Sequence, residues 1–415
     1  MKIGKYSFGT GDRFAHQGEA QLRAIIQAKE AGIDITPVWN KSHREHTTIK
    51  SEPRQTLQEA RDAVTKLVWK GDFFVDADHI NLNNVEHFLK SSNFFTIDVA
   101  DYIGKKVDSK LIENFIIDNK RFIGNLNIPG ISKPFKITRI ELEEIAGKYL
   151  YAVNEAEKIF LHIAENKGID QFVAEVSMDE VDEPQTPVEL FFILSALSRV
   201  NLPLQTIAPK FTGRFNKGVD YAGNIKQFAR EFEEDLLVID YAVKEFGLPD
   251  NLKLSVHSGS DKFSIYPVMG ELIKKHDKGI HVKTAGTTWL EEVIGLALAG
   301  GEALEIVKTI YKRGLNRFDE LCGPYATVID IDKSKLPTPE EIDTWDGEKF
   351  ANTLRHDQQH PDYNLNFRQL IHVSYKIAAE MGTEYTQALE EHEDIVGRQV
   401  TENIYERHIK RLFDL

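Results

Sequence analysis

Acidic, basic and histidine side chains recur where short β-rich segments of the chain end, and their spacing could bring them together. Asp76 and Asp78 stand two residues apart, as do His281 and Lys283. Alternate residues of a strand point to one face, so each pair is expected to face the same side. Convergent carboxylates and imidazoles are the side chains that proteins use for acid–base catalysis and for binding divalent metals.

A metal site is the first chemistry that these residues indicate. His79, His257 and His281 come from three different segments and supply three imidazoles for an open Zn²⁺ site, with Mn²⁺ or Ni²⁺ as alternatives. The sequence has neither an HExxH nor a CxxC motif, so this ligand set is inferred from topology. Asp179 and Glu175 are alternative ligands. Each histidine could instead only form hydrogen bonds at a strand end.

Two Gly-containing loops that carry a lysine are suited to binding an anion. The first covers residues 257–262, and the second covers residues 283–288 and leads into a helix N-terminus. Free backbone N–H groups and the helix dipole favour a carboxylate or phosphate there. An ordinary turn followed by a helix cap is the alternative. The residues predicted to contact substrate are Asp12, Arg13, Glu175, Lys210, Arg214, Lys217, Asp220, Ser258, Asp261, Lys262, Lys283 and Thr284.

The segments that must position these residues alternate with helical patterns along the chain. Each is a short run rich in β-branched and aromatic residues, followed by a polar or Gly-rich break and then a helical period. Between the fourth and fifth runs lies a long helical segment with a capping box at 138–141, and a second box stands at 186–189. We predict strands over residues 2–8, 33–39, 73–78, 94–99, 172–176, 204–211, 252–257 and 280–284.

Eight strands that alternate with helices predict a (β/α)8 TIM-type barrel over residues 1–330. A doubly wound open sheet is the alternative, but the turn at 9–12 lacks the third glycine of the dinucleotide-binding motif. Residues 331–415 are predicted as a C-terminal helical extension packed on the barrel. Three helices are expected after Pro337, with a polar break at 355–363. In a barrel, the polar strand ends meet at the face that carries the active site.

Composition limits the classes of protein to consider. The chain has 415 residues, a formal net charge of −14 and one cysteine, Cys322. The negative charge argues against a nucleic-acid partner, and the single cysteine argues against a disulfide scaffold. We find no targeting pattern and no run of 18 apolar residues, so we expect a cytoplasmic protein without a membrane partner. Assembly into a homo-oligomer is left open.

Five of these stretches resemble the tagaturonate epimerase family. They are residues 76–79, 176–180, 213–221, 257–264 and 281–287. The resemblance runs from the first strand into the C-terminal helices, including residues 366–379, and so covers most of the chain. It implies a metal-dependent isomerase of hexuronate catabolism that interconverts D-tagaturonate and D-fructuronate, with D-tagatose and D-fructose as a further pair. The partner would then be a small ketouronate or ketose.

A retro-aldol route fits this resemblance. The two ketouronates differ at the carbon β to the ketone, whose C–H is too weakly acidic for simple enolisation. Chelation of the ketone and the adjacent hydroxyl by a metal could stabilise an enediolate while a C–C bond breaks and re-forms. Asp78 and Asp179 are the candidates for moving the hydroxyl proton. Lys262, Lys283 and Arg214 are the candidates for holding the carboxylate.

Other functions stay open on the sequence alone. The stretches around His79 and His257 also resemble metal-site stretches of class II, zinc-dependent ketose aldolases. A class II-type aldolase or a ketose 3-epimerase is therefore an alternative on the same barrel. Proton abstraction by two opposed bases and transient oxidation are rival routes, although the sequence shows no dinucleotide motif. A barrel that only binds sugar acids is the non-enzymatic alternative.

Overall fold

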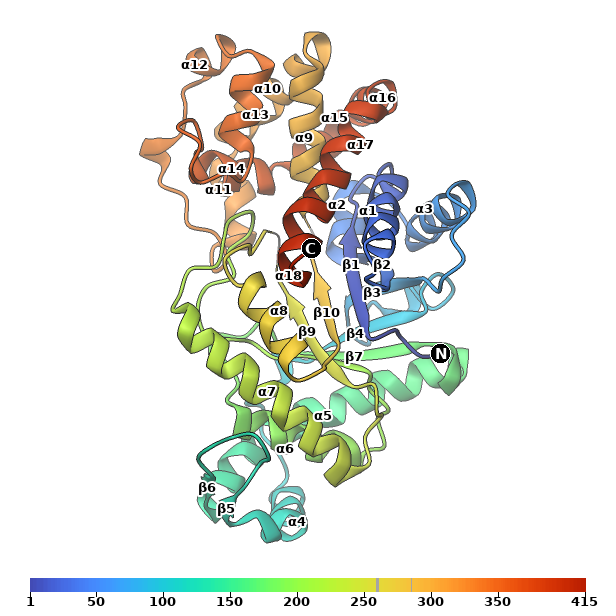
Figure 1. Ribbon diagram of the computed structural model, residues 1–415, viewed down its shortest axis with the longest axis vertical. Coiled ribbons are helices and arrows are strands. Elements are labelled where there is room, and N and C mark those ends of the chain that lie inside the picture. Colours follow the sequence, from blue (N-terminus) through green and yellow to red (C-terminus); the bar gives the residue numbers. More distant parts are fainter. Residues whose placement is uncertain (259–260, 285) are drawn as a thin grey trace.

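Eight parallel strands close into a barrel in the computed structural model, which describes residues 1–258, 261–284 and 286–415 (Figure 1). They follow one another in chain order, and the last pairs with the first. The predicted (β/α)8 barrel is confirmed, and the open sheet is wrong. The strands are β1 (Tyr6–Gly11), β2 (Ile35–Ser42), β3 (Phe74–Ile80), β4 (Phe94–Asp98), β7 (Val173–Ser177), β8 (Thr206–Ala208), β9 (Lys253–His257) and β10 (Ile280–Lys283).

The first strand begins later and extends further than the sequence predicts. β1 begins at Tyr6 rather than Lys2, and it includes Gly9 to Gly11, a stretch expected to form a turn. A Cβ on Gly9 would lie 2.9 Å from Cγ of Lys283. Gly9 therefore leaves room for the Lys283 side chain to enter the barrel, a use of glycine that a strand permits.

Helices cover the outside of the barrel between most successive strands, but β3 and β4 are joined only by a short 3-10 helix, Val85–His87. Both predicted capping boxes are present, with Thr138 and Glu141 beginning α5 and with Thr186 and Glu189 beginning α6. The segment between β4 and β7 also holds a short antiparallel hairpin of β5 (Gly124–Leu126) and β6 (Phe135–Ile137), so its prediction as wholly helical is wrong. The helices are α1 (Gly18–Glu30), α2 (His43–Ile49), α3 (Pro53–Lys66), α4 (Ser109–Asn119), α5 (Arg139–Lys167), α6 (Pro187–Arg199), α7 (Ile225–Phe246) and α8 (Tyr266–Lys275).

The barrel interior is apolar near the amino-terminal ends of the strands and polar further toward their carboxyl ends. Near the amino-terminal ends of the strands, Val38, Phe74, Phe94 and Val173 form a buried cluster with Ile3. Further along the strands, alternation places polar and charged side chains inside. The inward residues that are at most 3% exposed include Asp76, Thr96, Glu175, Ser255, His281 and Lys283.

The segment after β10 forms a second group of helices beyond the carboxyl ends of β1, β9 and β10 (Figure 1). Leu412 of α18 (Lys410–Phe413) belongs to the core of the barrel, whereas all the other helices of this group contribute to a separate apolar core that includes Trp289, Tyr311 and Phe367. This core contains residues on both sides of residue 330, and the division predicted there stays a prediction. The helices are α9 (Thr287–Ala299), α10 (Gly301–Asn316), α11 (Phe318–Cys322), α12 (Pro339–Asp343), α13 (Gly347–Leu354), α14 (Leu365–Val373), α15 (Tyr375–Met381), α16 (Thr383–Glu391), α17 (Glu393–Glu402) and α18 (Lys410–Phe413).

The predicted set of three helices after Pro337 is wrong, although the break between α13 and α14 spans the expected polar stretch. The chain turns more often than its apolar pattern indicates, for example at Gly382, which has a φ of 61° and precedes α16. The end of the chain then returns to the barrel. Thr401 in α17 donates a hydrogen bond to the carbonyl of Ala20 in α1 at 2.9 Å.

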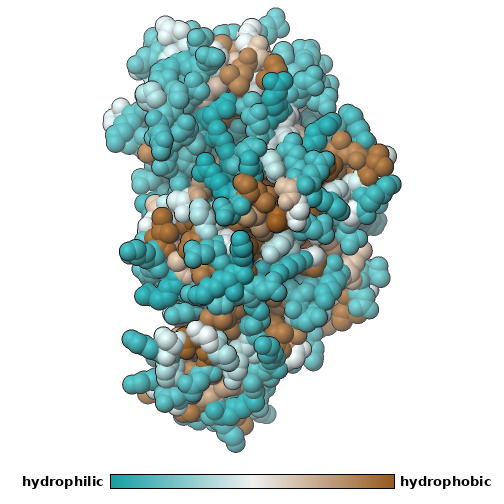
Figure 2. All heavy atoms as spheres, in the orientation of Figure 1, coloured by the Kyte–Doolittle hydropathy of each residue, from teal (hydrophilic) through white to brown (hydrophobic). Residues whose placement is uncertain are grey.

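Figure 2 shows a mainly hydrophilic face on which hydrophobic residues form small separate patches. Within the described parts of the chain, every helix is too short or too polar to span a bilayer.

Candidate active site

A bulge in β3 turns His79 into the mouth of the barrel. The register between β3 and β4 shifts between Ala77 and Ile80, and His79 has a φ of 52°. Regular alternation would point His79 away from the face that Asp76 and Asp78 share, and a bulge re-aims a side chain in this way. A left-handed conformation costs a non-glycine residue about 1–3 kcal/mol, and such strain is concentrated at functional sites.

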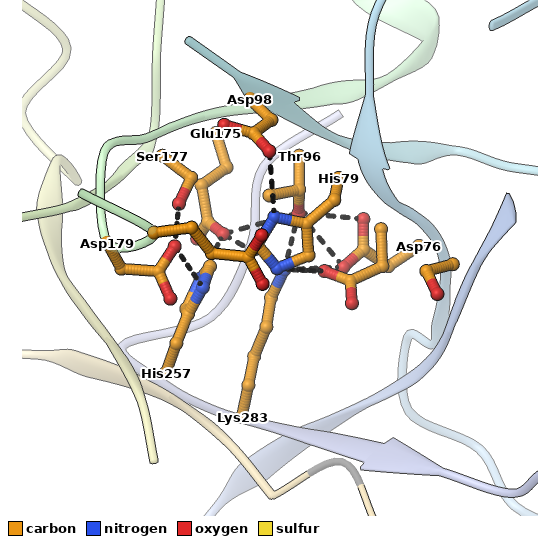
Figure 3. Close-up of polar contacts among 12 residues, drawn as sticks. Asp76, His79, Thr96, Asp98, Glu175, Ser177, Asp179, His257 and Lys283 are labelled. Carbon is orange, nitrogen blue, oxygen red and sulfur yellow. Dashed lines mark hydrogen bonds and ion pairs between the residues drawn. The ribbon is translucent and has the colours of Figure 1, made fainter. Parts of the chain in front are cut away.

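His79, Asp179 and His257 form the group best placed to hold a metal ion (Figure 3). One donor atom of each lies within 4.8 Å of the other two. Nδ1 of His257 lies 3.2 Å from Oδ1 of Asp179, and its Nε2 lies 2.8 Å from Oε1 of Glu175. Two imidazoles and a carboxylate are a donor set that suits Zn²⁺, Mn²⁺ or Ni²⁺. The residues present therefore fit a divalent ion.

Asp98, at the end of β4, supports the ring of His79. Its Oδ2 lies 3.3 Å from Nδ1 of His79. A carboxylate that holds one ring nitrogen fixes the orientation of the other, as in many metal sites. Asp98 and Glu180 also form a second donor group with His79, again within 4.8 Å.

The carboxylates around the two imidazoles control their protonation. Burial alone would lower the pKa of each ring, but Asp179 raises the pKa of His257 to about 9. Asp78 and Asp98 likewise raise the pKa of His79 well above its usual value. Burial would raise the pKa of Asp179, yet the two histidines lower it. A metal ion would therefore have to displace protons from both rings as it binds.

Lys283 forms ion pairs with three carboxyl groups inside the barrel (Figure 3). Its Nζ lies 2.7 Å from Oδ2 of Asp76, 2.9 Å from Oδ1 of Asp78 and 3.0 Å from Oε1 of Glu175. It also donates a hydrogen bond to Oγ1 of Thr96. Burial would lower the pKa of Lys283, but the carboxylates raise it well above its usual value. Lys283 lines the cavity, but its ammonium group already has three carboxylate partners, so its predicted role in holding a substrate carboxylate stays a prediction.

The two aspartates of β3 have pKa values on opposite sides of the usual one. Burial raises the pKa of Asp76 to about 6. Burial acts on Asp78 in the same direction, but Lys283, His79 and His257 lower its pKa to about 2. Asp78 is therefore ionised at neutral pH. Carboxyl groups whose pKa values are separated by their surroundings are typical of acid–base sites.

The structure places His281 apart from the other two predicted metal ligands. His281 is fully buried, and its Nδ1 shares a 2.9 Å hydrogen bond with Oγ of Ser7. Burial lowers its pKa to about 3. His281 precedes Lys283 by one inward position of β10, so it lies deeper than the mouth. Among the residues that the structure describes, it belongs to no group of three metal donors.

A cavity of about 580 Å³ opens at the carboxyl ends of the strands. Pockets for small molecules have volumes of about 300–1,000 Å³, so a six-carbon sugar acid fits. Residues of the C-terminal segment, including Tyr325 and His372, contribute to its wall. The predicted site residues that line it are Arg13, Asp78, His79, Asp179, Lys210, Arg214, Lys217, His257 and Lys283.

Seven predicted substrate residues do not line this cavity and have structural partners instead. Asp12 accepts hydrogen bonds from the backbone N–H groups of residues 14–17, before α1. The Lys262 ammonium donates to the carbonyl oxygens of Asn216 and Val219. Gly259, Ser260 and Ala285 of the predicted anion loops lie outside the described residues. The seven are Asp12, Glu175, Asp220, Ser258, Asp261, Lys262 and Thr284.

Three more of these seven residues also form hydrogen bonds within the protein. Asp220 accepts from the backbone and hydroxyl of Ser264. The hydroxyl of Ser258 donates to the carbonyl of Lys283 at 2.7 Å, and that of Thr284 donates to the carbonyl of Gly9 at 3.2 Å. Because loop residues of this kind stabilise turns as readily as they bind anions, their types alone did not distinguish the two roles.

Sequence reasoning missed several residues of the site. Asp98 and Glu180 stand at strand ends, where polar residues indicated a site, but no role was predicted for them. His372 lies within the stretch 366–379 that resembles the epimerase family, but its helix follows all the barrel strands. Only the folded structure brings that helix to the cavity.

Comparisons with known proteins give a consistent result. A family model described as tagaturonate epimerase matches residues 1–412. The tagaturonate/fructuronate epimerase of Thermotoga maritima is 29% identical over 425 residues, which cover 99% of this chain and 80% of that protein. A glycerol complex and a native crystal structure of the fructuronate-tagaturonate epimerase from Cohnella laeviribosi have TM-scores of 0.80 and 0.78. Each of the two structures is 22% identical in sequence to this protein. The match covers 99% of this chain and 82% of the chain in the crystal, and the fold is the same.

Proposed function

The chain belongs to the tagaturonate epimerase family, whose members are isomerase-class epimerases, and on this premise we propose that it interconverts D-tagaturonate and D-fructuronate. The observation that carries the proposal is the group of His79, Asp179 and His257 beside the ionised Asp78, in a cavity that the cationic side chains of Arg13 and Lys217 also line. D-Tagatose and D-fructose, which differ at the same carbon, are further substrates to test.

We propose a retro-aldol route for the change of configuration. A base takes the proton of the hydroxyl on the carbon β to the ketone, and that carbon becomes an aldehyde as its bond to the α carbon breaks. The bonding electrons pass into the ketone fragment as an enediolate. After the aldehyde turns its other face, the bond re-forms and the alkoxide recovers the proton. Atoms and electrons balance without an oxidant.

His79, Asp179 and His257 would hold a divalent ion, which when bound supplies positive charge for the oxygen atoms of the ketone and its neighbouring hydroxyl. We assign Asp179 to this group rather than to proton transfer, because it contacts His257 directly. Asp78 is then the base, since it lines the cavity in its ionised form. Lys283 positions it through the 2.9 Å contact between Nζ and Oδ1.

The test is conversion of D-tagaturonate in D₂O, followed by NMR, before and after metal is removed with EDTA. The proposal expects D-fructuronate without deuterium at the β carbon, loss of activity on stripping and recovery with Zn²⁺, Mn²⁺ or Ni²⁺. Deuterium at the β carbon would indicate direct proton abstraction, and deuterium at the α carbon would indicate enolisation. Release of an aldehyde fragment would indicate an aldolase. Full activity in the stripped protein would exclude metal dependence.

A further inference from the structure

His372 reaches the cavity from outside the barrel. It lies in α14, is 2% exposed and lines the cavity together with the loops that follow β8. Its Nδ1 is buried, and no residue that the structure describes gives it a hydrogen-bond partner. A buried polar atom in this state costs free energy unless a ligand or water completes it.

Two glycines make room for this imidazole. A Cβ on Gly286 would lie 2.4 Å from Cε1 of His372, and a Cβ on Gly218 would lie 3.3 Å from its Cβ. Both glycines have left-handed backbones, with φ values of 94° and 76°. The loops after β8 and β10 are therefore shaped around His372, which indicates a built position rather than a chance contact.

A buried ion pair fixes the helix that carries His372. Arg368 stands one turn earlier on the same face of α14, and its Nη2 lies 2.6 Å from Oδ2 of Asp261. Its Nε also donates to the carbonyl of Gly218. Asp261, which the sequence suggested as a substrate ligand, thus acts through Arg368 as a positioning residue.

Arg13 lies beside His372, and some of its N–H groups form no hydrogen bond with the described residues. The same Cβ on Gly286 would lie 3.3 Å from its Nη2. The guanidinium carbon of Arg13 lies 4.2 Å from the ring centroid of Tyr375, and its Nε lies 3.5 Å from Oε1 of Glu45. The described residues leave its Nε and Nη1 without a hydrogen bond although both atoms are buried. A guanidinium held this way is prepared for a planar carboxylate.

We propose that Arg13 and His372 form the subsite for the carboxylate of the substrate, so that α14 makes this enzyme prefer ketouronates to neutral ketoses. The inference rests on the proposed function, because that function supplies the ketouronate. Burial, with Arg13 and Lys217 nearby, lowers the pKa of His372, so the ring is a neutral hydrogen-bonding group beside a fixed cation. Arg13, whose Nε lies 3.5 Å from Oε1 of Glu45, is the cationic group of this subsite.

The experiment compares substrates with and without a carboxylate on the metal-loaded enzyme. Arg13→Gln and His372→Leu are assayed with D-tagaturonate and D-tagatose, and calorimetry measures binding of D-galactonate and galactitol, which have no ketone and do not react. We expect Arg13→Gln to raise KM for D-tagaturonate and Kd for D-galactonate by about tenfold or more, because it removes a charged hydrogen bond. KM for D-tagatose and Kd for galactitol should change by less than about twofold.

Controls separate a lost contact from a damaged fold. His372→Asn keeps a hydrogen-bonding group near the position of Nδ1 and should restore part of the affinity that His372→Leu loses. His276, which directly follows α8, is bonded to Glu233 away from the cavity, so His276→Gln should behave like the parent enzyme. Equal losses for charged and neutral ligands, or unchanged D-galactonate binding in Arg13→Gln and His372→Leu, would overturn the inference.

The failure of the proposed function would look different from the failure of this subsite. A parent enzyme that binds D-galactonate through Arg13 and His372 but does not convert D-tagaturonate would reject the function and keep the subsite. A parent enzyme that converts D-tagaturonate while the variants keep its KM would keep the function and reject the subsite.

Discussion

The environment of Asp78 keeps its carboxyl group ionised, the form that can accept a proton. Lys283, His79 and His257 hold its pKa at about 2, so it carries a negative charge throughout the neutral range. Asp78→Asn keeps the shape of the side chain and removes the proton acceptor. We expect kcat to fall by a factor of about 10²–10⁴, the usual contribution of a general base, while metal content stays the same. Asp101→Asn is the control, because Asp101 is exposed. A parent-like kcat in Asp78→Asn would remove Asp78 from this role.

Two histidines of neighbouring strands offer a direct test of the metal group. His257 has donor atoms near those of His79 and Asp179, whereas His281 bonds Ser7 inside the barrel. Elemental analysis should find His257→Ala well below one metal per chain and His281→Asn near the parent value. His281→Asn should instead lose about 1–3 kcal/mol of unfolding free energy, because it disturbs a buried hydrogen bond. Metal loss in His281→Asn but not in His257→Ala would reverse the assignment.

Among the secondary elements, β3 combines strain with function. His79 is held at a φ of 52° by the bulge, and glycine is the residue that tolerates this backbone. In metal-free protein, we therefore expect His79→Gly to be more stable than His79→Ala by about 1 kcal/mol, since only alanine keeps the strain. Both variants should lose metal. Urea unfolding followed by circular dichroism measures the difference, and equal stabilities would mean that the bulge is relaxed.

Regular strand patterns were predictable, and departures from them were not. The alternation around Asp76 and Asp78 gave the inward face of β3 correctly, because the period of a strand is fixed by its backbone. The bulge that brings His79 to the same mouth breaks that period, so no count of alternate residues could have placed it. His281 shows the converse, since it has the correct parity but lies one layer too deep to meet the other imidazoles.

Too many polar loop residues were predicted to contact substrate, because the sequence does not show which partners the fold gives them. Arg13 and Lys217 line the cavity, whereas Lys262 and Asp261 bond to backbone carbonyls and to Arg368. The sequence shows that these side chains lie near the strand ends, but the partners of Lys262 lie in the loop after β8 and the partner of Asp261 lies in α14. The contribution of His372 depends on the same helix and could be found only after that helix was placed.

For the whole molecule, the decisive question is whether the barrel can fold stably without the helices that follow residue 330. We predict that a chain ending at residue 330 does not fold into a stable enzyme, because α9 and α10 share one core with residues 342–396. Trp289, Ile294 and Tyr311 are each at most 1% exposed in that core, and exposing such side chains costs about 1.5–3 kcal/mol apiece. A few of them match the net stability of a typical domain, about 5–15 kcal/mol. The truncated chain should aggregate or unfold without a cooperative thermal transition, whereas a cooperative transition near that of the full chain would show that residues 1–330 form an independent domain.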